Sequence, residues 1–456
     1  MKIENPANGE LLAEVAEDTA ATVAAAYQRA RAAQPGWAAT PLAERTARVA
    51  RFRDLVEANK DSLALTLTRE MGKPLKQALN ELTALRGRID FFLKHVAGVM
   101  KEESVLHLAD GSLDEVIGHE PLGVVANVSA WNYPWFVGSN VFVPALLTGN
   151  SVVYKPSEYT TLTGRRIGEL FQEAGVPADV FVCVVGGGAV GAALVEQPVD
   201  GVFFTGSYGT GRRIAERVAP RMIRLQLELG GKDPTYVTDD VDVHAAAESL
   251  ADGAMYNTGQ SCCSVERIYV HEQVEAAFVE AFVEVVRGFR LGDPEDPETY
   301  IGPLARPAQL DVLDAQVADA VAGGARLLTG GKRAARTGAY FEPTVLAGAT
   351  QRMKLMRDES FGPIIGIGSV KDDEEAVALM NDTEYGLTAG VYCRDLARAE
   401  RVLARVDAGS VYMNACDRVS PRLPWTGRRH SGIGSTLSTY GIRAFLQPKA
   451  WHKKRA

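Results

Sequence analysis

The sequence predicts an α/β protein built on doubly wound parallel sheets. Short apolar runs alternate with helical segments between Val124 and Leu229, and a second series of the same kind begins after Gly231. Strands and helices that alternate at this spacing are typical of parallel strands joined by right-handed crossovers. An Asp-Gly turn between two alternating runs, at Asp110 and Gly111, predicts a hairpin ahead of the first series. The simplest division is therefore two α/β lobes and a small β element.

The composition is that of an ordinary globular chain. Its 456 residues carry 49 Lys and Arg against 57 Asp and Glu, which gives a net charge of −8, and 46% of them are hydrophobic. At roughly 150 residues per domain, this length allows about three domains. The acidic balance without a basic cluster argues against nucleic acid as the main partner, because phosphate binding needs clustered Lys and Arg.

The five cysteines form neither a disulfide framework nor a metal-binding pattern. We therefore expect a reducing compartment and no metal. The N-terminal residues lack the apolar core of a signal peptide, and no run of about 18 or more apolar residues occurs. The expected protein is cytoplasmic and has no membrane partner.

The region ahead of the first series is expected to be helical. Residues 18–100 show apolar positions at helical spacing, with Pro35, Pro41 and Pro74 between the segments. The hairpin around Asp110-Gly111 follows. Because a lone hairpin is only marginally stable, we expect it to pack on another element or another subunit.

The elements of the two series follow from their apolar runs. The first series is expected to contain strands 124–128, 151–154, 180–185, 202–204 and 223–227, with helices such as 163–174 between them. The second is expected to contain helix 243–255, strand 267–270, helix 274–289 and strands 364–370 and 410–414.

Two glycine-rich turns follow predicted strands and open predicted helices. One is Gly-Gly-Gly-Ala-Val-Gly at 186–191, and the other is Thr-Gly-Ser-Tyr-Gly-Thr-Gly at 205–211. A phosphate site at a helix N-terminus has this arrangement, although each turn alone is equally compatible with a structural role. Two such turns in adjacent crossovers favour a dinucleotide site.

A polar turn at 257–263, Asn-Thr-Gly-Gln-Ser-Cys-Cys, carries the sharpest chemical signal. A thiol in such a loop can be activated, so Cys262 or Cys263 is the candidate nucleophile. Its partner is either a histidine, of which only His430 has a site-like context, or Glu228 at the end of an apolar strand. Partial burial at the carboxyl edge of a sheet would raise the pKa of Glu228 and suit it as a general base. An ordinary surface glutamate is the alternative.

Five ordered motifs together resemble the aldehyde dehydrogenase superfamily. They are Ala-Trp-Asn-Tyr-Pro at 130–134, Phe-Thr-Gly-Ser at 204–207, Leu-Glu-Leu-Gly-Gly-Lys-Asp-Pro at 227–234, Gly-Gln-Ser-Cys at 259–262 and Glu-Ser-Phe-Gly-Pro at 359–363. The resemblance runs over nearly the whole chain. Within the superfamily, the cysteine region is similar to that of succinate-semialdehyde dehydrogenases.

The resemblance implies an architecture. A Rossmann-type NAD(P)-binding domain would comprise residues 1–101 and 123–230, an α/β catalytic domain 231–430, and an oligomerisation element 102–122 and 440–456. The hairpin and the last strand-like run, 444–452, would pair across subunits to give a homodimer or homotetramer.

The resemblance also implies the catalytic roles. Cys262 would attack an aldehyde to form a thiohemiacetal, whose oxyanion the Asn132 amide and the Cys262 backbone N–H would stabilise. Hydride loss to a nicotinamide would leave a thioester, and Glu228 would activate the water that hydrolyses it to a carboxylic acid. Two other classes remain open. An acyl-CoA or acyl-phosphate reductase needs no water-activating glutamate, and a catalytically silent binding protein would be expected to have lost one of these three residues.

For the cofactor, the resemblance places Lys155 and Glu158 at the adenosine ribose. A carboxylate there favours NAD over NADP, although Lys155, Arg212 or Arg213 could still accommodate a 2′-phosphate. The other cofactor-binding residues that it implies are Trp131, Gly188, Gly206, Ser207, Gly211, Leu229, Glu359 and Phe361.

The resemblance is incomplete around the substrate. The implied pocket residues are Tyr133, Tyr256, Ser261, Cys263 and Trp425. Asn140 departs from the family's aromatic lining, and Ser435-Thr436 stand where the family often carries Arg-Glu, so a glutamate relay to Glu228 is absent. Arg418 and Arg422 either clamp a substrate carboxylate or form a solvent-facing pair. The expected substrate is a semialdehyde or a general aliphatic or aromatic aldehyde.

Overall fold

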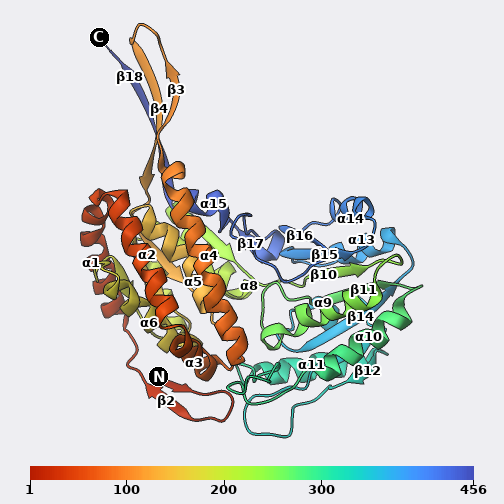
Figure 1. Ribbon diagram of the computed structural model, residues 1–456. Coiled ribbons are helices and arrows are strands. Elements are labelled where there is room, and N and C mark those ends of the chain that lie inside the picture. Colours follow the sequence, from red (N-terminus) through yellow and green to blue (C-terminus); the bar gives the residue numbers. More distant parts are fainter. Residues whose placement is uncertain (456) are drawn as a thin grey trace.

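The computed structural model describes residues 1–455 and shows two α/β lobes with an arm that projects from one of them (Figure 1). The lobes contain a six-stranded and a seven-stranded sheet, and the arm contains a three-stranded sheet. A short pair of strands, β1 (Lys2–Glu4) and β2 (Leu11–Glu14), lies at the N-terminus. This architecture confirms the predicted α/β class.

The first sheet is parallel except at one edge. Its strands, in spatial order, are β17 (Gly432–Ile433), β9 (Arg224–Glu228), β8 (Gly201–Thr205), β5 (Val124–Val128), β6 (Ser151–Lys155) and β7 (Phe181–Cys183). The late strand β17 runs antiparallel to β9 and pairs Gly432 with Glu228. The chain thus returns to the first lobe after completing the second. All five predicted strands of this series are confirmed, although β7 is shorter than expected.

Helices cover both faces of this sheet. They are α1 (Ala20–Ala39), α2 (Leu42–Ala58), α3 (Lys60–Met71), α4 (Leu75–Met100), α5 (Pro134–Leu147), α6 (Thr161–Glu173), α7 (Gly188–Glu196), α8 (Tyr208–Val218) and α15 (Ser438–Arg443). Gly72 ends α3 in the left-handed conformation, with φ of 83°. Pro35 does not end a helix as expected, because α1 continues through it. The buried Trp37 holds the last turn of α1 by donating its indole N–H to the Leu146 carbonyl at 2.9 Å.

The second sheet has one antiparallel strand, β12, at its edge. Its order is β12 (Arg326–Thr329), β13 (Thr344–Ala347), β14 (Ile364–Val370), β11 (Arg267–His271), β10 (Pro234–Val237), β15 (Thr388–Tyr392) and β16 (Ser410–Met413). The helices of this lobe are α9 (Val243–Met255), α10 (Glu275–Gly288), α11 (Gln309–Ala322), α12 (Lys354–Arg357), α13 (Asp373–Asn381) and α14 (Leu396–Leu403). The expected helix 243–255 and strand 364–370 match α9 and β14 residue for residue.

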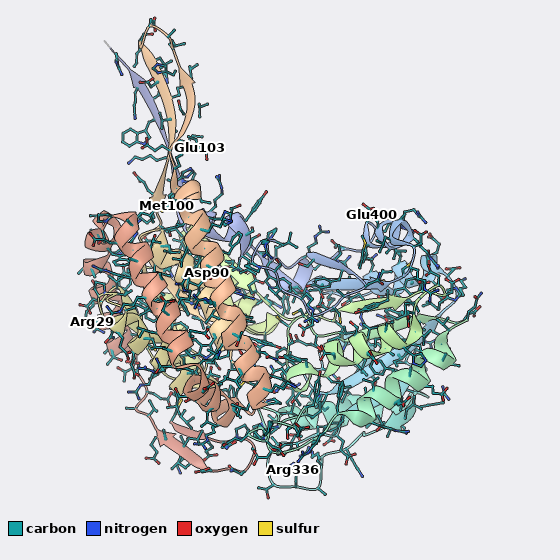
Figure 2. All side chains as sticks on the ribbon, viewed as in Figure 1. Arg29, Asp90, Met100, Glu103, Arg336 and Glu400 are labelled. Carbon is teal, nitrogen blue, oxygen red and sulfur yellow. The ribbon has the colours of Figure 1, made fainter. Side chains whose placement is uncertain are left out.

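The arm begins where α4 ends, between Met100 and Glu103 (Figure 2). It consists of β18 (Leu446–Lys454), β4 (Leu113–Pro121) and β3 (Glu103–His107), in that order. The hairpin therefore has a partner within this chain, which is the last strand, β18. The reason is that α15 packs on α4 and α5 and so returns the chain to the base of β4. Ala456, the last residue of the expected 440–456 segment, lies outside the described residues.

An aromatic cluster holds the helices of the first lobe against its sheet. Phe142 on α5 is fully buried, and its ring lies edge-on to those of Phe52, Tyr154, Phe171 and Phe181 at centroid distances of 5.4 to 6.3 Å. These rings come from three helices and two strands. The Phe142 side chain therefore joins helices of the first lobe to its sheet.

Phe142→Ala should lower the free energy of unfolding by about 3–5 kcal/mol, because it removes a buried ring and leaves a cavity. Urea denaturation followed by tryptophan fluorescence measures the change. Met222→Ala is the control, since the Met222 side chain is 91% exposed and its truncation should change stability by less than about 0.5 kcal/mol. Equal midpoints for the two variants would contradict the role of this cluster.

Candidate active site

The loop that carries Cys262 has an unusual backbone. Between the end of α9 and β11, Asn257 and Thr258 both adopt the left-handed conformation, with φ of 54° and 59°. Gly259 follows with φ of 70°, and a Cβ atom there would lie 2.2 Å from the Gly362 carbonyl oxygen. Only glycine fits this position. The resulting turn leaves Cys262 partly buried against the core of the first lobe, at the face between the lobes.

Asn132 is fastened to this loop from the other lobe. It follows β5, precedes α5 and is 3% exposed. Its side-chain amide donates to the Gln260 carbonyl at 3.2 Å, and the Asn257 amide donates to the Asn132 carbonyl at 3.3 Å. The structure thus brings Asn132 and the Cys262 loop together, although they are far apart in the sequence.

Glu228 lies at the carboxyl end of β9 and is 7% exposed. Its Oε1 accepts hydrogen bonds from Gln226 Nε2 at 2.8 Å and Thr436 Oγ1 at 3.1 Å, whereas its buried Oε2 has no partner. Burial raises the pKa of Glu228 to about 8, and the two hydrogen bonds oppose that rise. Thr436 reaches the carboxylate because β17 pairs with β9. It stands at one of the two positions where the sequence departs from the family pattern.

Cys263 differs from Cys262 in being buried. Its thiol donates to Asp417 Oδ1 at 3.0 Å, and Ser261 Oγ donates to the same oxygen at 3.3 Å. The contact with Cys262, burial and the Asp417 carboxylate together raise the pKa of Cys263 well above its ordinary value. Cys263 therefore stays a thiol and fixes the loop, and Cys262 is the cysteine left free to react.

Lys232 and Glu266 organise the cofactor side of the site. Lys232 Nζ lies 2.6 Å from Glu266 Oε2, and both side chains are buried. Glu266 also accepts the backbone N–H groups of Ser360 and Phe361 at 3.0 to 3.3 Å. The ion pair thus fixes the turn that carries Glu359 and Phe361. Sequence reasoning passed over Lys232 although it lies inside the 227–234 motif, and nothing in the local sequence marks Glu266.

Glu359 faces the glycine pair after Glu228. Its Oε1 accepts from the Gly231 N–H at 3.1 Å, and a Cβ atom on Gly230 would lie 2.3 Å from the same oxygen. Burial raises the pKa of Glu359 to about 7. Phe361 lies edge-on to Trp131, with ring centroids 5.4 Å apart. A carboxylate with one unpaired oxygen beside two aromatic rings suits a ribose and a nicotinamide ring.

The N-terminus of α8 suits a pyrophosphate. Ser207 precedes this helix and makes no side-chain hydrogen bond to its first turn, so no side-chain cap competes with a ligand there. A Cβ atom on Gly209 or on Gly188 would meet nothing within 4 Å, so both positions border open space. Gly206 and Gly211 instead pack against Phe204 and Leu229, where no side chain would fit. Among the expected cofactor-binding residues, Gly188 therefore borders open space, whereas Gly206 and Gly211 pack against neighbouring side chains.

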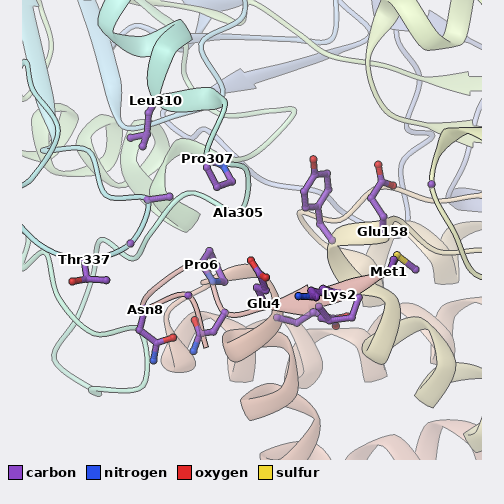
Figure 3. Close-up of a pocket in the computed structure, with 18 of the residues that line it drawn as sticks. Met1, Lys2, Glu4, Pro6, Asn8, Glu158, Ala305, Pro307, Leu310 and Thr337 are labelled. Carbon is purple, nitrogen blue, oxygen red and sulfur yellow. The ribbon is translucent and has the colours of Figure 1, made fainter. Parts of the chain in front are cut away.

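The adenosine end is marked by Lys155 and Glu158. Lys155 Nζ lies 3.6 Å from Glu158 Oε2, and the Glu158 side chain is 41% exposed. Glu158, Tyr159 and Gly187 line a cavity of about 580 Å³, together with the N-terminal strand and Leu310 of the second lobe (Figure 3). This cavity contains none of Cys262, Glu228 or Asn132. The residues present thus fit an extended dinucleotide, with the Glu359 and Glu158 carboxylates available to its hydroxyl groups.

Four of the five expected substrate residues gather around the Asp417 carboxylate. Ser261 and Cys263 donate to it, and burial first and the nearby Asp417 charge next raise the pKa of Tyr133 and Tyr256. Tyr133 is half-buried under the ammonium group of Lys73, which lies 3.7 Å from its ring centroid, and the Tyr256 hydroxyl accepts from Asn80 at 3.1 Å. Trp425 is 7% exposed and packs in the core of the first lobe. Arg418 and Arg422 are exposed, and neither guanidinium has a hydrogen-bond partner within residues 1–455. The structure therefore gives no support to a carboxylate clamp in that loop.

The described residues contain neither a metal-binding cluster nor a membrane-spanning helix. Among residues 1–455, no group of three or more His, Cys, Asp or Glu side chains could hold a metal ion. No helix in the described part of the chain is long and apolar enough to cross a membrane.

The fold and this geometry define a two-lobed α/β oxidoreductase with a partly buried thiol, Cys262, between its lobes. The chain belongs to the aldehyde dehydrogenase family, whose model matches residues 1–451. It is 37% identical over 448 residues to a betaine aldehyde dehydrogenase of Cereibacter sphaeroides, covering 98% of this chain and 92% of the relative. It is 38% identical over 450 residues to a Mycolicibacterium smegmatis protein named "Putative succinate-semialdehyde dehydrogenase [NADP(+)]", covering 98% and 87% of the two chains.

Solved structures also resemble this chain closely over nearly its whole length. An NAD-dependent aldehyde dehydrogenase of Sinorhizobium meliloti superposes with a TM-score of 0.96 at 35% identity, over 99% of this chain and 91% of that one. An NADP-dependent enzyme of E. coli also gives a TM-score of 0.96, at 34% identity, over 100% and 94% of the two chains. The protein is therefore an enzyme that oxidises an aldehyde with a nicotinamide cofactor.

Thr436→Val should move the pH dependence of turnover. A base must be ionised, so thioester hydrolysis should rise with pH through the pKa of Glu228, which is about 8. Removing the Thr436 donor raises that pKa further and shifts the rising limb to higher pH. Initial rates between pH 6 and 10 with a substrate limited by hydrolysis measure the shift, and Thr436→Ser, which keeps the donor, should resemble the wild type. An unshifted Val profile would rule out the role of this hydrogen bond.

Proposed function

We propose that Cys262 is the nucleophile and that Asn132 and Glu228 serve its two half-reactions. The observation that carries this proposal is the attachment of the Asn132 amide to the loop of a half-buried cysteine, whose neighbour Cys263 is held as a thiol by Asp417. The Cys262 thiolate attacks the carbonyl carbon. The second N–H of the Asn132 amide and the backbone N–H of Cys262 then donate to the oxyanion of the thiohemiacetal.

Glu228 acts in the second half-reaction. A bound nicotinamide supplies the acceptor for the hydride that leaves the thiohemiacetal carbon. A thioester then remains on Cys262, and Glu228 takes a proton from the water that attacks it. The carboxylic acid departs and the thiolate is restored. The unpaired Oε2 of Glu228 is the atom available for that proton.

The retained residues favour hydrolysis over the alternatives. An acyl-CoA or acyl-phosphate reductase has no use for a buried base with two dedicated donors, and a silent binding protein has no use for the whole constellation. The substrate that we propose is a semialdehyde or a general aliphatic or aromatic aldehyde. The Mycolicibacterium smegmatis relative supports the first possibility by its name.

We propose NAD as the preferred cofactor. The Glu158 carboxylate borders the cavity at the adenosine end, where it can accept hydrogen bonds from a free 2′-hydroxyl and repel a 2′-phosphate. Lys155 is already paired with Glu158, which weakens its attraction for a phosphate.

We also propose a cytoplasmic homo-oligomer assembled through the arm. Five free cysteines suit a reducing compartment. On the arm, Val105 and Trp451 are 61% and 43% exposed, which leaves apolar surface for a partner subunit.

Glu228→Gln should separate the two half-reactions. The variant keeps the shape and polarity of the side chain but cannot accept the proton from water. Stopped-flow absorbance should show a burst of about one NADH per active site and then a steady rate at least about 100-fold below that of the wild type. Cys262→Ser is the matched control and should show no burst. Steady turnover of the Gln variant at the wild-type rate would contradict the assignment.

Glu158→Gln should shift the cofactor preference. The change removes the charge that repels a 2′-phosphate and leaves an amide of the same size. The ratio of kcat/KM for NADP to that for NAD should rise by about tenfold or more in initial-rate assays. Glu169→Gln, on the exposed surface of α6, is the control and should leave the ratio unchanged. A preference for NADP in the wild type would refute the proposal.

A further inference from the structure

Arg88 is an exception among the buried cations of the described chain. The buried lysines 73, 155 and 232 each have a carboxylate partner, and the buried Arg45 and Arg267 each donate to several carbonyl oxygens. Arg88 is 5% exposed, yet within residues 1–455 it makes a single hydrogen bond, from Nη1 to Asn140 Oδ1 at 2.8 Å. A buried charge is costly unless it is fully paired. The arrangement therefore lacks an anion.

The unused part of the guanidinium has a definite geometry. Nε and Nη2 have no partner among the described residues, and neither atom is fully sealed from solvent. Their N–H bonds are parallel, so they form the edge of a guanidinium that binds a carboxylate through two hydrogen bonds. The guanidinium of Arg88 lies over the Phe136 ring, whose centroid is 4.0 Å from Cζ. Burial lowers the pKa of Arg88 to about 10, so it remains cationic at neutral pH.

Arg88 lies on the face of α4 that builds the aldehyde side of the site. Gln77, Glu81 and Arg88 are spaced by 4 and 7 residues and so share one helix face. Gln77 Oε1 accepts from the Asn257 N–H in the cysteine loop at 2.8 Å. Glu81 accepts from the N–H groups of residues 135 and 136 at the start of α5. Arg88 continues this face toward Asn140, about 10 Å beyond Glu81 at 1.5 Å per residue.

No neighbouring carboxylate is free to neutralise Arg88. Glu81 is the carboxylate that acts on Arg88 from the same face of the helix, but Glu81 Oε2 lies 2.5 Å from Lys73 and Oε1 accepts the two backbone N–H groups of α5. Asp417, on the far side of Lys73, holds the Cys263 thiol and Ser261. The positive charge of Arg88 is thus left for a group that arrives with the substrate.

We propose that the free Nε and Nη2 edge of Arg88 binds the terminal carboxylate of the substrate, so that the enzyme selects semialdehydes of dicarboxylic acids. This inference rests on the proposed function, because it places the aldehyde end of the same molecule at Cys262. It replaces Arg418 and Arg422 as the source of carboxylate recognition. It also gives the polar Asn140 a task, which is to hold the guanidinium in place with its amide oxygen.

The test compares acid and alkanal substrates of equal length. Wild-type initial rates are measured with succinate, glutarate and adipate semialdehydes and with butanal, pentanal and hexanal. One acid should be preferred over its alkanal, and in Arg88→Leu the acid-to-alkanal ratio of kcat/KM should fall about 10- to 100-fold, mainly through KM for the acid. Arg88→Lys keeps the charge without the parallel N–H edge, so its acid-to-alkanal ratio should lie between those of the wild type and Arg88→Leu.

Two further variants separate recognition from folding. Asn140→Asp places a carboxylate against Arg88 and should also abolish the acid preference, although the guanidinium remains. Arg86→Leu removes the same charge from the outer surface of α4, where Arg86 lies within 4.0 Å of Asp54 and Asp90, and should leave the ratio unchanged.

Three results would overturn the inference. An equal loss for acids and alkanals in Arg88→Leu would mean that Arg88 only joins α4 to α5. A wild-type ratio near one at every chain length would exclude a carboxylate site. If the wild type oxidised none of the six aldehydes with NAD or NADP, the proposed function would fail together with this inference. In the first two outcomes the enzyme still oxidises aldehydes, so only the inference about Arg88 fails.

Discussion

The buried ion pair of Lys232 and Glu266 is the interaction on which the site depends. It joins three segments that are distant in the sequence: the motif after Glu228, the start of β11 behind the cysteine loop, and the turn that carries Glu359 and Phe361. Loss of either charge would leave the other buried without a partner, at a cost of about 3–5 kcal/mol. The ion pair, together with the hydrogen bonds that Gln309 and Gln316 donate to the same turn, therefore fixes Glu359 and Phe361 relative to the cysteine loop.

Two buried glutamates show how similar burial can serve different tasks. Glu228 and Glu359 lie on either side of Gly230 and Gly231, and burial raises the pKa of both. Glu228 has side-chain donors on one oxygen only, which suits it to exchange a proton through the other. Glu359 is bound by the backbone of Gly231, which fixes it in place as an acceptor. Neighbouring donors, rather than burial, determine what each carboxyl can do.

Much of the fold and part of the site could be predicted from the sequence. Apolar periodicity located the strands, and the motif residues Cys262, Asn132 and Glu228 could be named because their local sequence is distinctive. Asp417, Glu266 and Arg88 could not, since each acts through contacts between segments that only the folded chain brings together. Trp425, which the resemblance assigns to the substrate pocket, is 7% exposed and packs with the core of the first lobe, a burial that its local sequence does not reveal.

Helix α4 connects the cysteine loop to the arm. Its 26 residues form one unbroken rod of about 39 Å, with the cysteine loop attached near one end and the arm growing from the other. A helix of this kind transmits rotation with little bending. Gln77 near the start of α4 accepts from the cysteine loop, and Met100 at its end leads into the arm. A displacement of either end therefore reaches the other through one continuous helix.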